Sequence, residues 1–207
     1  MKKVIIFILC VFMGMMVINN VKAQDEMIME KNIQDKLIRF HVIANTDTKE
    51  DQNLKLKVKD EVIKYIQPKL ENCKSINESR EVLKKNDSKI IKIAENIIKQ
   101  EGFDYDVKSS LSKENFPIKT YGNITLPAGE YEAYRIIIGN GKGHNWWCVM
   151  FPPLCFVDIT RGEVSYNKTE SEMKKVLSKD EYNLVDNTCK EEIKLKFKLL
   201  DIIRSLR

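Results

Sequence analysis

The sequence predicts one α+β domain: a strand, two helices, an antiparallel β meander and a C-terminal helix. Two observations predict this class. Apolar residues recur at spacings of three and four through most of residues 49–100, which is the period of a helix. Between residues 103 and 158 they alternate instead with polar residues, as in half-exposed strands. Because no internal repeat or low-complexity linker divides the 207 residues, we expect a single core.

The first 23 residues have the layout of a secretory signal. Two lysines precede an apolar run over residues 4–18, and Val21 and Ala23 offer small residues for a cut after Ala23. The run is shorter than the ~20 apolar residues of a membrane span, although an uncleaved anchor stays open. Removing residues 1–23 lowers the formal charge from +5 to +2. This disfavours a nucleic-acid binder and leaves weak attraction to an anionic membrane surface open.

After the signal we expect an α+β domain at residues 24–163 and a helical tail at residues 164–207. Residues 37–44 form a β-rich run that ends in Asn45-Thr46-Asp47, a turn-forming sequence, and predict a central strand. Thr48 is the expected N-cap of a first amphipathic helix that runs to about Pro68.

A second helix is expected from Ser75, which opens a capping box with Glu78, to Gly102. Strands follow, starting with the alternation at Phe103 and Tyr105. The glycine cluster at residues 139–143 lies between two predicted strands, so it predicts a hairpin loop rather than a phosphate cradle. The tail ends in an amphipathic helix with the apolar stripe Leu195, Leu199, Ile202, Ile203 and Leu206, which we expect to dock on the domain.

Residues 144–158 hold both tryptophans and two of the five cysteines around a Pro-Pro turn. They predict a strand–turn–strand unit in which Cys148 lies opposite Cys155, within reach of a disulfide. Free buried thiols are the alternative. A zinc site is disfavoured, because neither C-x-x-C nor H-x-x-x-H occurs, and no cofactor is predicted.

Trp146 and Trp147 are adjacent, so their indoles point to opposite faces of the predicted strand. One should enter the core, and the other can meet a partner, although helices covering both faces would bury both indoles. We therefore predict a partner-binding surface along the loop and strand. Its residues are Gly139, Gly141, Gly143, Asn145, Trp146 and Trp147.

One set of residues suits acid–base catalysis: His41, Asp47 and His144. Catalysis would require the two histidines to meet across neighbouring strands, with Asp47 orienting one imidazole. The competing interpretation places His41 on one strand face, satisfied by a nearby carboxylate. No serine lies in a nucleophile-elbow pattern, so we expect no enzyme.

Several motifs together resemble the stage II sporulation protein R family. They are residues 39–47 (RFHVIANTD), 50–52 (EDQ), 54–60 (LKLKVKD), 121–122 (YG), 126–133 (LPAGEYEA), G-x-G-x-G at 139–143 and NWWC-x-x-FPPLC at 145–155. Thr46 stands where the family pattern has serine, which keeps the hydroxyl. The resemblance covers about residues 36–158, and the tail carries no matching motif.

The resemblance implies an exported signalling protein of endospore-forming bacteria, acting between the two membranes that separate forespore and mother cell. Its implied partner is a membrane-embedded aspartic protease, stage II sporulation protein GA, which processes the sigma-E precursor. The alternative is an exported hydrolase or amidase that uses His41, Asp47 and His144.

Overall fold

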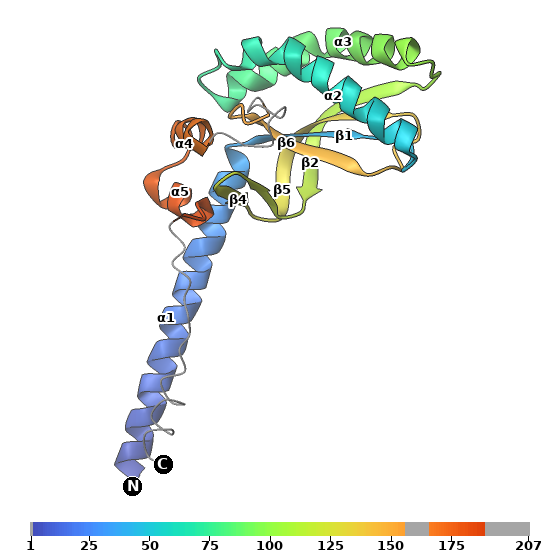
Figure 1. The fold of residues 1–207 in the computed structure, drawn as a ribbon. Coiled ribbons are helices and arrows are strands. Elements are labelled where there is room, and N and C mark those ends of the chain that lie inside the picture. The colour runs from blue at the N-terminus through green and yellow to red at the C-terminus, as the bar shows by residue number, and fades with distance from the viewer. Residues whose placement is uncertain (1, 156–165, 189–207) are drawn as a thin grey trace, which may run out of the picture.

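The computed structural model describes residues 2–155 and 166–188 and confirms the α+β class. The elements in chain order are α1 (Lys2–Asp35), β1 (Ile38–Ile43), α2 (Lys49–Leu70), α3 (Ile76–Gln100), β2 (Val107–Phe116), β3 (Lys119–Tyr121), β4 (Ile124–Leu126), β5 (Gly129–Ile138), β6 (Asn145–Phe151), α4 (Tyr166–Lys174) and α5 (Lys179–Val185). Figure 1 shows α2 and α3 lying along one side of the sheet, with α1 projecting away from the domain.

The main sheet has the strand order β2-β5-β1-β6, so β1 is central, as predicted. It runs parallel to β5 and antiparallel to β6, while β2 pairs antiparallel with β5. Because β1 lies between β5 and β6, the glycine loop that connects these two strands is not a hairpin loop, and that prediction was wrong. Sequence neighbours usually pair, but here an earlier strand separates them.

Helices α2 and α3 cover one face of the sheet, where Phe40, Tyr134 and Met150 belong to a buried apolar cluster. Thr48 caps α2 as predicted, with its hydroxyl accepting from the Asp51 amide at 3.3 Å. Pro68 lies inside the last turn of α2 rather than ending it. Ser75 caps α3, and Glu78 reaches back to the amide of Lys74 at 2.7 Å instead of to that of Ser75.

A second apolar cluster covers part of the opposite face. It joins Ile33 at the end of α1 to Tyr131 and Val149 of the sheet and to Met173 and Tyr182 of the segment containing α4 and α5. Figure 1 shows α4 and α5 beside the domain end of α1. The small β3–β4 sheet contributes Ile124 and Leu126, both fully buried, to the same cluster.

Helix α1 runs without a break through the predicted cleavage position after Ala23. All described side chains from Phe12 to Ile28 are exposed, and the buried ones, Ile33 and Gln34, come later. A cut after Ala23 would therefore remove no described contact of the core. Of the helices whose residues the structure describes, none has the length and apolar character needed to span a bilayer.

Three predictions concern segment ends. Phe103 and Tyr105 precede β2 rather than belonging to it, and their rings pack 5.2 Å apart between centroids. Leu154 and Cys155, which were expected to open the strand after the Pro-Pro turn, are not in a strand, and Cys155 lies in a turn. The rest of that expected strand, residues 156–158, lies outside the described residues, as does the amphipathic stripe at residues 195–206.

Candidate functional site

The turn between β1 and α2 is built from short polar side chains that bond to one another. The Asp51 carboxylate accepts from the Thr46 hydroxyl at 2.6 Å and from the Asn45 amide at 3.0 Å. Burial acts to raise the pKa of Asp51, but hydrogen bonds from Thr46 and Asn45 outweigh it and lower that pKa. The turn is therefore ordered by an ionised, nearly buried carboxylate.

The glycine loop packs directly on this turn, although about 95 residues separate the two in sequence. Asn45 Oδ1 accepts from the backbone N–H of Asn140 at 2.9 Å, and the Gly143 amide donates to the Ala44 carbonyl at 2.9 Å. A Cβ on Gly143 would lie 2.2 Å from the Thr46 carbonyl oxygen, and backbone cannot yield easily. Glycine is needed here for close approach.

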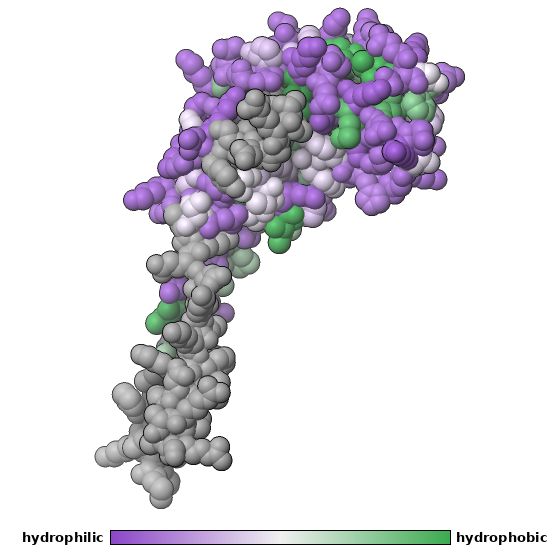
Figure 2. Space-filling view, viewed as in Figure 1, coloured by the Kyte–Doolittle hydropathy of each residue, from purple (hydrophilic) through white to green (hydrophobic). Residues whose placement is uncertain are grey.

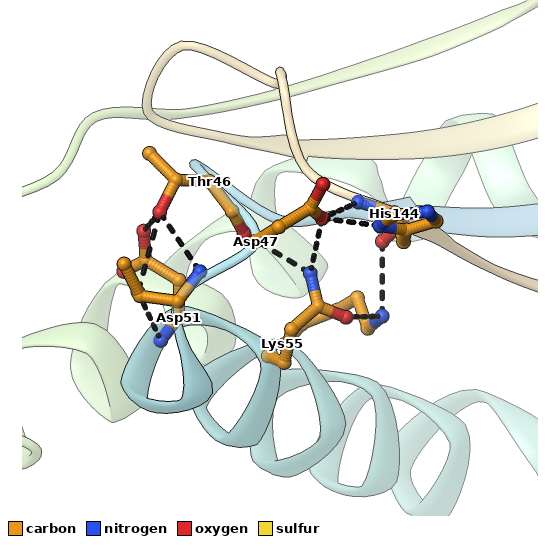
Figure 3. A network of polar contacts seen from close by, with 7 residues as sticks. Thr46, Asp47, Asp51, Lys55 and His144 are labelled. Atoms are coloured by element: carbon orange, nitrogen blue, oxygen red, sulfur yellow. Dashed lines mark hydrogen bonds and ion pairs between the residues drawn. The ribbon is translucent and has the colours of Figure 1, made fainter.

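Asp47 and His144 form the exposed centre of the contact between the two loops (Figure 3). One carboxylate oxygen of Asp47 accepts from the His144 backbone N–H at 2.6 Å and lies 2.5 Å from its Nδ1. The backbone hydrogen bond, followed by the side-chain one, lowers the pKa of Asp47. With Nδ1 so engaged, Nε2 is the ring nitrogen left for solvent, because the His144 side chain is 83% exposed.

Lys55 of α2 also stabilises the contact between the two loops. Its ammonium donates to the His144 carbonyl at 2.9 Å and to Gln52 Oε1 at 2.5 Å, while Gln52 donates in turn to Asp47 and to the Thr46 carbonyl. Burial lowers the pKa of Lys55. We call the surface formed by residues 45–48 and 139–147 the loop rim. Its two halves are joined by a continuous hydrogen-bond network.

His41, the third candidate for catalysis, does not join Asp47 and His144. It lies opposite Trp147 in the β1–β6 register and is 4% exposed. Its ring stacks on the Trp147 indole at 4.9 Å between centroids and contacts Phe116 at 5.3 Å. Neither ring nitrogen has a hydrogen-bond partner among the described residues, so no carboxylate satisfies it. Burial, with help from Arg135 and Arg39, lowers the pKa of His41 to about 4.

The two indoles lie on opposite faces of β6, as predicted, and both are partly buried. Trp146 packs edge-on against Phe40 beneath α2, with the Lys59 ammonium 4.9 Å from its ring centre. Trp147 packs with His41 on the other face, where Lys119 approaches its ring to 5.8 Å. Each indole is therefore half core and half surface.

Cys148 and Cys155 are free, buried cysteines whose sulfurs approach one acceptor, the Val149 carbonyl, at 3.9 and 3.0 Å. This places the two thiols close together. Burial, followed by the neighbouring Cys148, raises the pKa of the Cys155 thiol. The disulfide between them stays a prediction.

Sequence reasoning did not select Arg39, which is fully buried on the face that α1 covers. Its guanidinium lies 4.4 Å from the Phe116 ring centre and 4.8 Å from that of Tyr131, and donates to the Tyr121 hydroxyl at 3.0 Å. Nη1 has no partner among the described residues. The signal that could have found it is its place in a strand predicted to be central, because both faces of such a strand can be covered.

Chemically, the loop rim offers a carboxylate-oriented imidazole. Cys148 is buried in the middle of β6 and Cys155 in the turn after β6, so neither thiol lies beside His144. One cavity of about 440 Å³ lies at the Pro-Pro turn, lined by Cys73, Phe151 and Pro152 among others. Among the described residues no group of three or more His, Cys, Asp or Glu side chains is placed to hold a metal ion.

Comparison with known proteins gives two matches. The profile of the family described as Stage II sporulation protein R (spore_II_R) matches residues 34–161. A protein of Bacillus subtilis (strain 168), Stage II sporulation protein R, is 41% identical over 160 residues, which are 77% of this chain and 70% of that protein. No solved structure matches the chain. The matched region contains the whole loop rim.

Proposed function

The chain belongs to the stage II sporulation protein R family, and from this premise we propose that it is an exported signal in endospore formation. In this proposal it crosses the forespore membrane and acts in the space between forespore and mother cell. There it binds and activates the membrane-embedded aspartic protease, stage II sporulation protein GA, that processes the sigma-E precursor. It works by binding, not by catalysis of its own.

The observation that carries the proposal is the loop rim within a chain of this family. Two segments far apart in sequence are fixed against each other by Asn45, Asp47 and His144, and Gly143 leaves no space between them. A surface ordered before binding loses little conformational entropy when a partner covers it. The rim also carries exposed polar groups beside the two half-buried indoles, which suits a protein interface.

Export is supported by the sequence layout of residues 1–23 and by the position of the core. Every described α1 side chain before Met29 is exposed, so none of the described leader side chains belongs to the core. Deleting residues 4–18 should therefore leave a folded protein that remains in the cytoplasm and does not signal. Normal processing by that cytoplasmic form would contradict the export proposal.

Reconstitution tests the activation directly. The protein is added to proteoliposomes that hold the protease and the sigma-E precursor, with its concentration varied, and precursor cleavage is measured. We expect cleavage to rise and saturate with added protein. Cleavage that is unchanged at saturating, well-folded protein would contradict the proposal.

The Asp47–His144 pair is the observation that favours the alternative function, a hydrolase or amidase, because a carboxylate-oriented imidazole is the arrangement of a general base. The His144→Ala variant separates the two functions. An enzyme would lose turnover at every concentration, whereas a binding protein would at most need a higher concentration to reach the same maximal cleavage. The backbone N–H of residue 144 still reaches Asp47 in this variant.

A further inference from the structure

We propose that the outer face of α3 docks on the surface of an anionic phospholipid bilayer. The contact is electrostatic, between lysine side chains of the helix and the phosphates of the lipid headgroups. The docking rests on the charges of the domain alone and does not depend on the proposed function.

A row of exposed lysines runs along this face of α3. They stand at positions i, i+4, i+7 and i+14, which is the spacing of one helical face. The apolar side chains that α3 contributes to the core lie on the opposite face. We call the four residues the lysine row: Lys85, Lys89, Lys92 and Lys99.

The acids of the same segment do not neutralise the lysine row. Residues 82–100 hold five lysines and two acids, Asp87 and Glu95. Asp87 faces the sheet, where its carboxylate accepts from the hydroxyls of Ser109 and Tyr134, both at 2.6 Å. Only Glu95 is left exposed beside the row. This short segment therefore has a formal charge of +3, more than the +2 of the whole chain after the signal.

The exposed lysines of α2 show the contrasting pattern of a solvated helix face. Lys57 pairs with Glu101 at 2.5 Å, and Lys64 pairs with Glu61 at 3.5 Å. Among residues 2–155 and 166–188 no member of the lysine row has an ion-pair partner. Like charges three and four positions apart repel and destabilise a helix. An anionic surface would remove this repulsion.

The composition of α3 fits a lipid surface better than a protein partner. Protein interfaces are depleted of lysine and are anchored by aromatic residues and arginine. α3 contains no aromatic residue, and its one arginine, Arg80, is held by Glu132 at 2.7 Å. Lysine is a point charge on a flexible stem, which suits phosphates in no fixed arrangement. Near an anionic leaflet each lysine tightens binding roughly fivefold.

The lysine row also lies where a flat surface can reach it. Figure 1 shows α3 at the border of the domain farthest from the N-terminal end of α1. Figure 2, viewed from the same side, shows mostly hydrophilic side chains along that border. A bilayer can therefore contact the whole row while α1 points away from it.

Vesicle binding by the full chain tests the docking. Vesicles of phosphatidylcholine measure what the apolar leader contributes, and replacing part of that lipid by phosphatidylglycerol adds negative charge. We expect at least about tenfold tighter binding to the anionic vesicles at low salt, and loss of the preference at high salt, because salt screens the attraction. Equal binding to the two kinds of vesicle at low salt would overturn the proposal.

Two triple variants locate the docking face. Lys85→Gln, Lys89→Gln and Lys92→Gln together should weaken binding to the anionic vesicles by about tenfold or more. The control removes the same charge from exposed lysines of α1, the glycine loop and α5, through Lys31→Gln, Lys142→Gln and Lys179→Gln. It should stay within about twofold of the wild type, because charges beyond the Debye length are screened. Equal losses would show that net charge alone directs binding and would overturn the assignment to α3.

Lysine acylation reads the contact on the unaltered chain. With anionic vesicles present, a water-soluble acylating reagent should label the lysine row more slowly, while Lys142 and Lys179 stay reactive. Mass spectrometry of the peptides reports each site. A row that stays fully reactive on vesicle-bound protein would overturn the proposal. If anionic vesicles gained no binding but the row variant lost precursor cleavage, the row would belong to a contact with an acidic protein, and docking on lipid would be overturned.

Discussion

Asp47 and His144 come from loops 97 residues apart, yet one carboxylate oxygen accepts the histidine's backbone N–H at 2.6 Å and lies 2.5 Å from its Nδ1. This contact closes the loop rim on its solvent side. It is the point at which a single substitution can loosen the rim without opening the core, because Asp47 is exposed.

Asp47→Ala should lower activation severalfold and leave the melting temperature near that of the wild type. The reason is that the carboxylate orders the rim but buries no apolar surface. Hydrogen exchange at the His144 amide should accelerate, and it checks the cause. Glu50→Ala, an exposed acid in the first turn of α2, is the control and should change neither quantity.

The pKa of Asp47 also fixes the acid limit of this contact. The pKa of Asp47 is lowered in the folded state, so the Asp47–His144 contact stabilises the rim fully above the ordinary carboxyl pKa near 4. This stabilisation is lost only as pH falls through the lower folded-state pKa. The rim should therefore stay closed at pH 5.

The lowered pKa of His41 leads us to predict that the free energy of unfolding depends on pH in a less acidic range. Its pKa falls from 6.5 to about 4 on folding, so the folded state favours neutral imidazole. Its stability contribution is complete above pH 6.5 and is lost as pH falls toward 4. The shift corresponds to about 3 kcal/mol. Denaturant unfolding at a series of pH values measures the slope.

The chain holds two histidines, which makes the control simple. His41→Phe should flatten the slope between pH 6.5 and 4, whereas His144→Gln should keep it. A slope that survives in His41→Phe would assign the titration to other groups.

Gly143→Ala should destabilise the domain by about 1–3 kcal/mol, the usual cost of forcing atoms into filled space. The added methyl meets the Thr46 carbonyl oxygen at 2.2 Å, and the loop must move to relieve it. Lys142→Ala, in the same loop but exposed, should change the free energy of unfolding by less than about 0.5 kcal/mol. Equal stability of the two variants would show that the loop is looser than its contacts imply.

The exported protein should carry a Cys148–Cys155 disulfide, because the two sulfurs share the Val149 carbonyl and export exposes them to oxidants. Closing so short a loop should stabilise the domain by up to about 2–3 kcal/mol. Alkylation of the unreduced, denatured protein followed by mass spectrometry decides it. Cys73, which is half-buried and lies in the connection after α2, is an internal control for labelling. Two alkylated thiols at positions 148 and 155 would exclude the bridge.

Arg39 should tolerate an apolar replacement better than truncation. Arg39→Met keeps the packing between Phe116 and Tyr131 and removes a buried charge whose Nη1 has no partner, so the cost should stay under about 1.5 kcal/mol. Arg39→Ala opens a cavity and should cost about 3 kcal/mol. Chemical denaturation compares the two. A larger loss in Arg39→Met would show that the charge itself stabilises the fold.

The starts of the two long helices could be predicted from the residues beside them. Thr48 and Ser75 marked the starts of α2 and α3, because their side chains satisfy amides within three residues. The place of β1 between β5 and β6 could not be predicted in this way. Arg39 and Phe40 pair in parallel with Ala133 and Tyr134, and no pattern in the sequence around β1 indicates those partners. The glycine loop therefore looked like a hairpin.

The candidate site was also predicted only in part. Asp47 and His144 were selected as residue types suited to proton transfer, and the structure brings them together. His41 was grouped with them, but strand register places it opposite Trp147. Register depends on how a whole strand is packed, which a single histidine does not reveal.

The central position of β1 has a consequence for the order in which the chain can fold. Residues 38–43 emerge early, yet both of their partner strands lie beyond residue 128. Until β5 (residues 129–138) has appeared, the first strand has nothing to pair with, and the main sheet is complete only at about residue 151. Such a high contact order delays closure of the sheet until synthesis of the domain is nearly complete. A chain of this topology therefore lacks a closed sheet during most of its synthesis, and a translocation channel requires a chain that has not yet folded.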